Sequence, residues 1–163
     1  MVRNFLFLVI ILFLIISCRR TKTTDSELVE AERVVVKSQD AGSYVDIMFY
    51  YSNDHPELYM EQLPYDLIMC NAKDGAACYN FYANYLKIRN SGKFDKESIR
   101  KLDKPEQDFL IYMLNKGALR EDMYCQMYLY YYYKNGIVVK KDSLKADSLS
   151  KIFPEGFFEK VDF

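Results

Sequence analysis

The sequence predicts an all-α protein in which short helices pack as antiparallel hairpins. Glycine and proline are sparse, with 6 and 4 of 163 residues, whereas a protein of many short strands needs turn residues between them. Apolar residues recur at the three- and four-residue spacing of a helix face. A shift of 47 residues also superposes Cys78 on Cys125 and Asp95 on Asp142, which indicates a repeated unit. We therefore expect about five or six helices stacked side by side.

The first element is a targeting segment at residues 1–17. Arg3 supplies a positive charge, and Phe5–Ile16 is an unbroken apolar run of twelve residues, whereas a membrane-spanning helix needs roughly 20. The run ends in Ile15 to Cys18, which resembles the lipobox of bacterial lipoproteins. This resemblance implies cleavage before Cys18 and a lipid on that cysteine. The alternative is an ordinary secretory signal in which Cys18 lies near the cleavage site by chance.

A lipid on Cys18 would anchor the mature protein, since the several acyl chains that the resemblance implies hold a protein to a membrane lastingly. We expect a location in the cell envelope, at the outer membrane and facing the periplasm, because Arg19 and Arg20 rather than acidic residues follow the cysteine. The membrane is thus one expected partner.

Residues 18–42 are predicted to form a polar, flexible tether. They are mostly polar and charged, and apart from Val34–Val36 they show no sustained apolar period. A flexible chain of this length would reach roughly 25 Å, enough to lift a domain clear of the lipid headgroups. Residues 43–153 would then form one helical domain.

The charge of the chain is balanced, with 22 basic and 23 acidic residues. No long block of like charge provides the electrostatic surface that nucleic acid requires. We therefore expect no nucleic-acid partner.

Helix boundaries in residues 43–121 follow from capping residues. Ser43–Tyr51 is a first, less regular element, and Tyr65–Asn71 pairs with Ala76–Ile88 around Asp74-Gly75. Asp95 opens a further helix. Asp103 begins a capping box with an early proline, and the helix that follows carries an apolar face. That face consists of Phe109, Leu110, Met113 and Leu114.

The tyrosine-rich stretch at residues 126–134 is predicted to be a helix that is buried on more than one side. Tyr128 and Tyr132 lie at helical spacing from Cys125 and are expected to point inward. Tyr130 and Tyr133 are expected to point outward, where they would contact a partner protein. Gly136 would end this helix, and Asp142 would cap the next one, which Pro154 ends.

This region resembles the Sel1-like repeat, a relative of the tetratricopeptide repeat. The residues that carry the resemblance are Leu129, the tyrosines, Gly136, Val138, Lys140, Asp142, Lys145 and Ala146. The resemblance extends over residues 64–153 and implies a short right-handed solenoid of antiparallel hairpins with a glycine turn at Gly117. Tyr124, Cys78 and Cys125 depart from it, because they stand where the family has alanine at close helix contacts.

Catalytic chemistry is not expected. The single histidine, His55, precedes Pro56 and Glu57 in a pattern typical of a helix start, and no second histidine completes a triad or a metal site. Phosphate-binding loops and nucleophile elbows are absent from the sequence. We therefore predict no enzyme activity, no cofactor and no metal.

Three cysteines remain beyond Cys18. An oxidising compartment permits a disulfide, and Cys70 with Cys78 is the favoured pair because it would close the turn between consecutive helices. The alternative is that these cysteines are free, since Cys78 and Cys125 also suit the packing of a small core residue.

The final segment, residues 154–163, is predicted to cap the last helix of the array. Four apolar side chains in ten residues are too many to leave in water, and a stack of helices needs its end covered. They are Phe157, Phe158, Val161 and Phe163. The alternative is that Phe157 and Phe158 are presented to a partner.

Two functions of different classes follow. The first is a membrane-tethered, periplasmic protein-binding module, since Sel1-like proteins are generally adaptors or scaffolds. The second is an immunity-type antagonist that binds and blocks a secreted enzyme. An envelope hydrolase ranks third, because no catalytic motif supports it.

Overall fold

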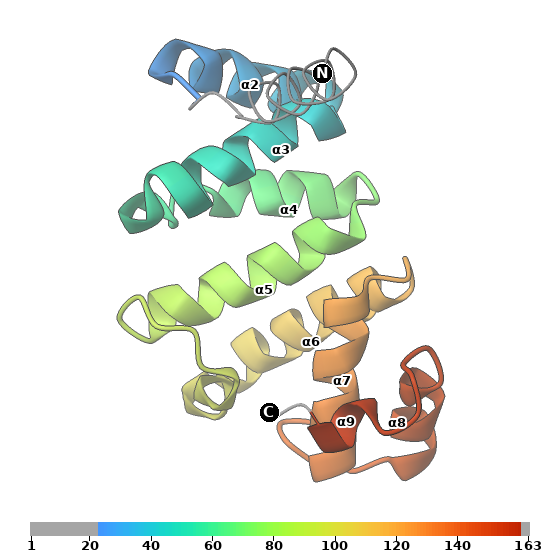
Figure 1. Ribbon diagram of the computed structural model, residues 1–163. Coiled ribbons are helices and arrows are strands. Elements are labelled where there is room, and N and C mark those ends of the chain that lie inside the picture. The colour runs from blue at the N-terminus through green and yellow to red at the C-terminus, as the bar shows by residue number, and fades with distance from the viewer. Residues whose placement is uncertain (1–22, 161–163) are drawn as a thin grey trace, which may run out of the picture.

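Helices are the regular elements of residues 23–160, the part of the chain that the computed structural model describes (Figure 1). This part contains no strand, so the predicted all-α class is confirmed for it. The predicted signal peptide, Cys18, Val161 and Phe163 lie outside the described residues. The helices are α2 (Asp25–Ser38), α3 (Ala41–Phe49), α4 (Leu63–Asn71), α5 (Gly75–Arg89), α6 (Lys104–Ala118), α7 (Met123–Asn135), α8 (Ser143–Ser150) and α9 (Phe157–Lys160).

Consecutive helices pack against each other in chain order from α2 to α8. Helices two apart also meet, because α4 contacts both α2 and α6, and α5 contacts α7. The helix α2 therefore lies at one end of the stack, and α8 and α9 lie at the other (Figure 1). Shorter turns connect the helices: a π-helical turn at Tyr50–Asp54 and 3-10 helices at Pro56–Leu58 and Lys96–Lys101.

The prediction of a flexible tether is wrong for residues 25–38, which form α2. Thr24 caps this helix in a capping box with Glu27, which satisfies free backbone N–H groups at its start. One side of the helix is buried against the domain through Leu28, Ala31 and Val35. Three apolar residues spaced over eight positions make a weak sequence pattern, and their burial becomes evident only from the surface of α3 and α4 that they cover.

The hairpin of α4 and α5 is closed as the sequence predicted. Asp74 caps α5 by accepting a hydrogen bond from the Ala77 backbone N–H at 3.0 Å. A disulfide joins Cys70 on α4 to Cys78 on α5, with a Cα–Cα distance of 4.7 Å, so the favoured pairing is confirmed. Cys125 is a free, buried cysteine.

The turn predicted at Gly117 is wrong in position. Gly117 lies inside α6, and the chain turns at Leu119 to Glu121, where Glu121 has a φ of 63°. A Cβ on Gly117 would overlap the sulfur of Cys125 and would lie 3.0 Å from the Cβ of Cys78. The glycine is therefore a point of close approach where α6 meets α5 and α7.

The other predicted caps lie where the sequence placed them. Asp103 forms the capping box of α6 with Glu106, and Asp142 caps α8 by accepting from the Lys145 N–H at 2.9 Å. Gly136 ends α7 in the left-handed conformation, with a φ of 67°. Asp95 also acts as a cap, but the helix that it opens is a 3-10 helix rather than an α-helix.

A buried carboxylate joins three helices at the middle of the stack. Asp66 on α4 has a relative exposure of 0%. Its Oδ1 accepts hydrogen bonds from the Tyr44 hydroxyl on α3 and from Gln62 Nε2, both at 2.8 Å, and its Oδ2 accepts from Asn84 Nδ2 on α5 at 2.9 Å. Burial raises the pKa of Asp66 to about 7, although these hydrogen bonds and nearby Lys87 act in the opposite direction.

We predict that this carboxyl makes the stability of the fold fall as pH rises from about 5 to about 7. A carboxyl in the unfolded chain titrates near about pH 4, so between that value and about 7 the folded protein holds a proton that the unfolded chain has released. The free energy of unfolding should decrease by roughly 2 kcal/mol between about pH 5 and pH 7. The measurement is chemical denaturation at a series of pH values.

Asp66→Asn should remove this decrease, because the amide carries no titrating proton. The matched control is Asp147→Asn, which changes an exposed carboxyl on α8 and should leave the pH dependence intact. An unchanged slope in the Asp66→Asn variant would show that other groups cause it.

Candidate functional site

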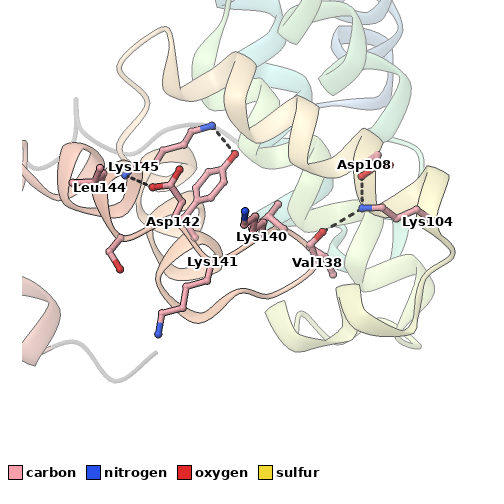
Figure 2. A pocket seen from close by; sticks show the side chains of 11 residues that line it. Lys104, Asp108, Val138, Lys140, Lys141, Asp142, Leu144 and Lys145 are labelled. Carbon is pink, nitrogen blue, oxygen red and sulfur yellow. Dashed lines mark hydrogen bonds and ion pairs between the residues drawn. The ribbon is translucent and has the colours of Figure 1, made fainter.

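A groove of about 730 Å³ lies at the α8 end of the stack (Figure 2). Residues 138–145, which connect α7 to α8 and begin α8, form one side of it. Lys104 and Asp108 from the first turns of α6 and Tyr133 from α7 complete the lining. The site thus combines residues that are about thirty positions apart in the chain but adjacent in the fold.

The connecting loop is held at both of its ends. The side chain of Ile137 is buried, and its N–H donates to the Tyr132 carbonyl at 3.1 Å. At the other end the Asp142 N–H donates to the Tyr133 carbonyl at 3.0 Å. Between them Val138 has a φ of 53°, a conformation that a β-branched residue seldom adopts. The chain's own backbone contacts therefore fix both ends of the groove wall to α7.

Lysine side chains give the groove a positive charge. Four lysines and two aspartates line it, which leaves an excess of positive charge. The lysines are Lys104, Lys140, Lys141 and Lys145. The two carboxylates are already engaged, since Asp108 pairs with Lys104 at 2.7 Å and Asp142 caps α8.

The four lysines differ in how they are held. Lys104 Nζ also donates to the Val138 carbonyl at 3.3 Å, and Lys145 Nζ donates to the Tyr133 hydroxyl at 2.6 Å and lies 4.1 Å from the centre of that ring. Lys140 and Lys141 are exposed and form no hydrogen bond or ion pair with any residue between 23 and 160 (Figure 2). These two ammonium groups are therefore the ones that are open to a ligand.

The two predicted contact tyrosines have different positions. Tyr133 lines the groove and is partly exposed, which is compatible with contact to a partner. The prediction that Tyr130 points outward is wrong, because its exposed fraction is only 9%. The ring of Phe158 stacks on the Tyr130 ring with centroids 3.8 Å apart. The C-terminal segment folds back over this side of α7, which helical periodicity alone does not reveal.

The contacts of Phe158 are those that a cap would make. Besides Tyr130, its ring meets Phe153 and Phe157, so the aromatic residues of the last segment cover one another and α7. A cap for the end of the array stays a prediction.

The inward tyrosines are confirmed as core residues. Tyr132 has an exposed fraction of 0% and Tyr128 one of 9%. The Tyr132 hydroxyl forms a hydrogen bond with the Tyr82 hydroxyl on α5 and donates to the Lys96 carbonyl at 3.0 Å. Burial raises the pKa of both phenols, so they remain protonated donors.

His55 and Cys125, two described residues of types that often act in catalysis, do not line the groove. His55 Nδ1 lies 3.3 Å from the Glu57 carboxylate, and the His55 ring contacts the Tyr50 ring at a tilt, with centroids 4.4 Å apart. It is far along the chain from the groove residues. Burial raises the pKa of the Cys125 thiol, which disfavours the reactive thiolate. Within the described range no cluster of histidine, cysteine, aspartate or glutamate side chains has an arrangement suited to a metal ion.

Comparison of the chain with protein-family models, curated proteins and solved structures gave no significant match. The Sel1-like resemblance therefore stays a prediction that rests on the residues quoted for it. None of the helices between residues 23 and 160 combines the length and apolar character that a membrane span requires.

The corrected position of Tyr130 changes the expected stability of its alanine variant. Tyr132→Ala should lower the free energy of unfolding by about 3 kcal/mol, and Tyr130→Ala by about 2 kcal/mol, because both rings are buried. Tyr112→Ala is the control, since the Tyr112 ring is 56% exposed and should cost under about 0.5 kcal/mol. Denaturant unfolding measures all three. A Tyr130 variant no less stable than the Tyr112 control would mean that the C-terminal segment does not cover α7.

Proposed function

We propose that this protein is a non-catalytic, protein-binding module that is tethered to the periplasmic side of a bacterial outer membrane by a lipid on Cys18. In this proposal the helices form a short right-handed solenoid of Sel1-like hairpins, and the partner is another protein. The observation that carries the proposal is the lysine-lined groove at one end of an ordered stack of helices.

The packing of the helices supports a repeat architecture. Contacts between neighbours and between helices two apart are the pattern of hairpins stacked in two layers. Such arrays expose long surfaces on a rigid frame, and this suits recognition of other proteins. The Cys70–Cys78 disulfide supports an oxidising location such as the periplasm.

The chemistry of the described residues supports binding rather than catalysis. The groove offers lysine ammonium groups and a tyrosine hydroxyl, and both of its carboxylates are occupied by a lysine or a helix start. General acid-base catalysis needs a group whose pKa lies near the working pH and that can reach a substrate. Asp66, whose pKa burial raises to about 7, is fully buried and hydrogen-bonded between helices, so it is not placed to reach a substrate.

We predict that Cys18→Ser releases the protein from the membrane fraction, because the serine hydroxyl cannot take the thioether-linked lipid. Cell fractionation with intact-mass analysis measures location and acylation together. Ser17→Ala is the matched control, since a small residue still precedes the cysteine, and it should stay acylated. Membrane retention of an unprocessed Cys18→Ser chain would contradict the proposal and would assign the anchor to Phe5–Ile16.

We further predict that the full chain, crosslinked in its own membranes and then affinity-purified, enriches one protein in near-equal amount. The control is residues 1–24 fused to an unrelated soluble protein, which keeps the proposed anchor and lacks the helices. Enrichment of a secreted hydrolase that the chain inhibits would favour the immunity-type alternative. Equal recoveries from the chain and the control would contradict a protein-binding function.

A further inference from the structure

We propose that the lysine groove binds an extended, acidic segment of the partner protein. This inference rests on the proposed function and adds the chemistry and the conformation of what is bound. The positive charge of the groove is the first observation that supports an acidic occupant. Two exposed lysines, Lys140 and Lys141, project from the groove wall without a partner among the described residues. Glutamate and aspartate side chains are the groups on a protein that complement them.

The backbone of the groove wall favours an extended occupant. Between Gly136 and Asp142 the chain is neither helix nor strand, and the backbone groups of residues 139–141 form no hydrogen bond with other described residues. An extended peptide can pair its own backbone with such a segment and direct alternate side chains toward it. A helical occupant could not pair along its length in this way, because its interior backbone groups are already hydrogen-bonded within the helix.

The groove is also preorganised, so that binding requires no rearrangement of its wall. Lys104 fastens the Val138 carbonyl to α6, and Lys145 lies over the Tyr133 ring, so the two sides are linked. Because the loop is already ordered, binding need not order it, and more of the interaction energy is available for affinity. Leu144, which is 84% exposed, offers an apolar contact at the edge.

The position of the groove favours a protein over a lipid surface. It lies at the α8 end of the stack, whereas α2, the helix that follows the proposed anchor, lies at the other end (Figure 1). A chain held at Cys18 would therefore present the groove away from its own membrane. Anionic lipids remain the competing source of negative charge, and the experiment includes them.

The experiment measures binding of a short, labelled peptide of glutamate, aspartate and leucine to the full chain in detergent by fluorescence anisotropy. We expect saturable binding that weakens as salt is raised, since salt screens exposed charges. The double variant Lys140→Gln and Lys141→Gln should bind about tenfold more weakly. A peptide with glutamine and asparagine in place of the acids should not bind.

The matched control variant is Lys37→Gln with Lys73→Gln. It removes the same charge from exposed positions on α2 and in the α4–α5 turn, outside the groove, and should bind as tightly as the parent chain. Equal weakening in both double variants would overturn the proposal, because net charge rather than the groove would then hold the peptide. Absence of binding to the parent chain would overturn it as well.

The last part of the experiment measures binding of the chain to vesicles that contain anionic phospholipid. If they bind through Lys140 and Lys141 and the peptide does not compete, the groove recognises a lipid surface and the proposal fails. These outcomes are separable from the proposed function. If the parent and the variant Lys140→Gln with Lys141→Gln capture a partner equally well, the protein-binding function is supported, and only the proposal that the groove is the binding site is refuted.

Discussion

The arrangement of the stacked helices depends on one buried carboxylate, Asp66. A carboxylate without contact to water is costly to the folded state unless its oxygens are hydrogen-bonded, and those of Asp66 accept from three side chains on different segments. The donors are themselves held, because Ser52 donates to Gln62 at 3.1 Å and Asn80 donates to the Tyr44 hydroxyl at 3.0 Å. A shift of α3, α4 or α5 would break hydrogen bonds of this network and leave buried polar groups without partners. The network therefore favours one packing of the three helices over others.

Tyrosine hydroxyls repeat this principle through the rest of the protein. The rings fill the space between helices while the hydroxyls reach polar groups on a neighbouring segment. Tyr51 donates to Glu32 on α2 at 2.7 Å, and Tyr85 donates to Glu106 on α6 at 2.5 Å. The hydrogen bond between Tyr82 and Tyr132 joins α5 to α7. These tyrosines therefore both fill the space between helices and fix how one helix is positioned against the next.

The proposed binding site lies where the regular stacking stops. At the α8 end, within residues 23–160, no further helical hairpin covers α7, and a loop, the short helix α8 and an aromatic segment pack there instead. The tail covers the Tyr130 side of α7, while the loop with its lysines is left open. Residues between two packed helices contact those helices, whereas residues at the end of the stack have one side without a helical neighbour.

The sequence by itself determined the helical class, the α4–α5 hairpin, and the caps Asp103, Gly136 and Asp142. It favoured the Cys70–Cys78 disulfide but left free cysteines as an alternative, which the structure excluded for this pair. These features depend on residues within one or two turns of each other, so local pattern is sufficient to predict them. Tertiary structure alone decided that α2 is a packed helix, because its few apolar residues need a surface that other helices provide.

Contacts between distant parts of the chain also explain the other features that the sequence did not predict. Tyr130 is covered by Phe158, Gly117 is required by the sulfur of Cys125, and Lys104 reaches the groove from another helix. Each contact joins residues that local periodicity does not relate. Helical spacing predicts which side chains share a face, but the elements that cover the face are set by the packing of the whole chain.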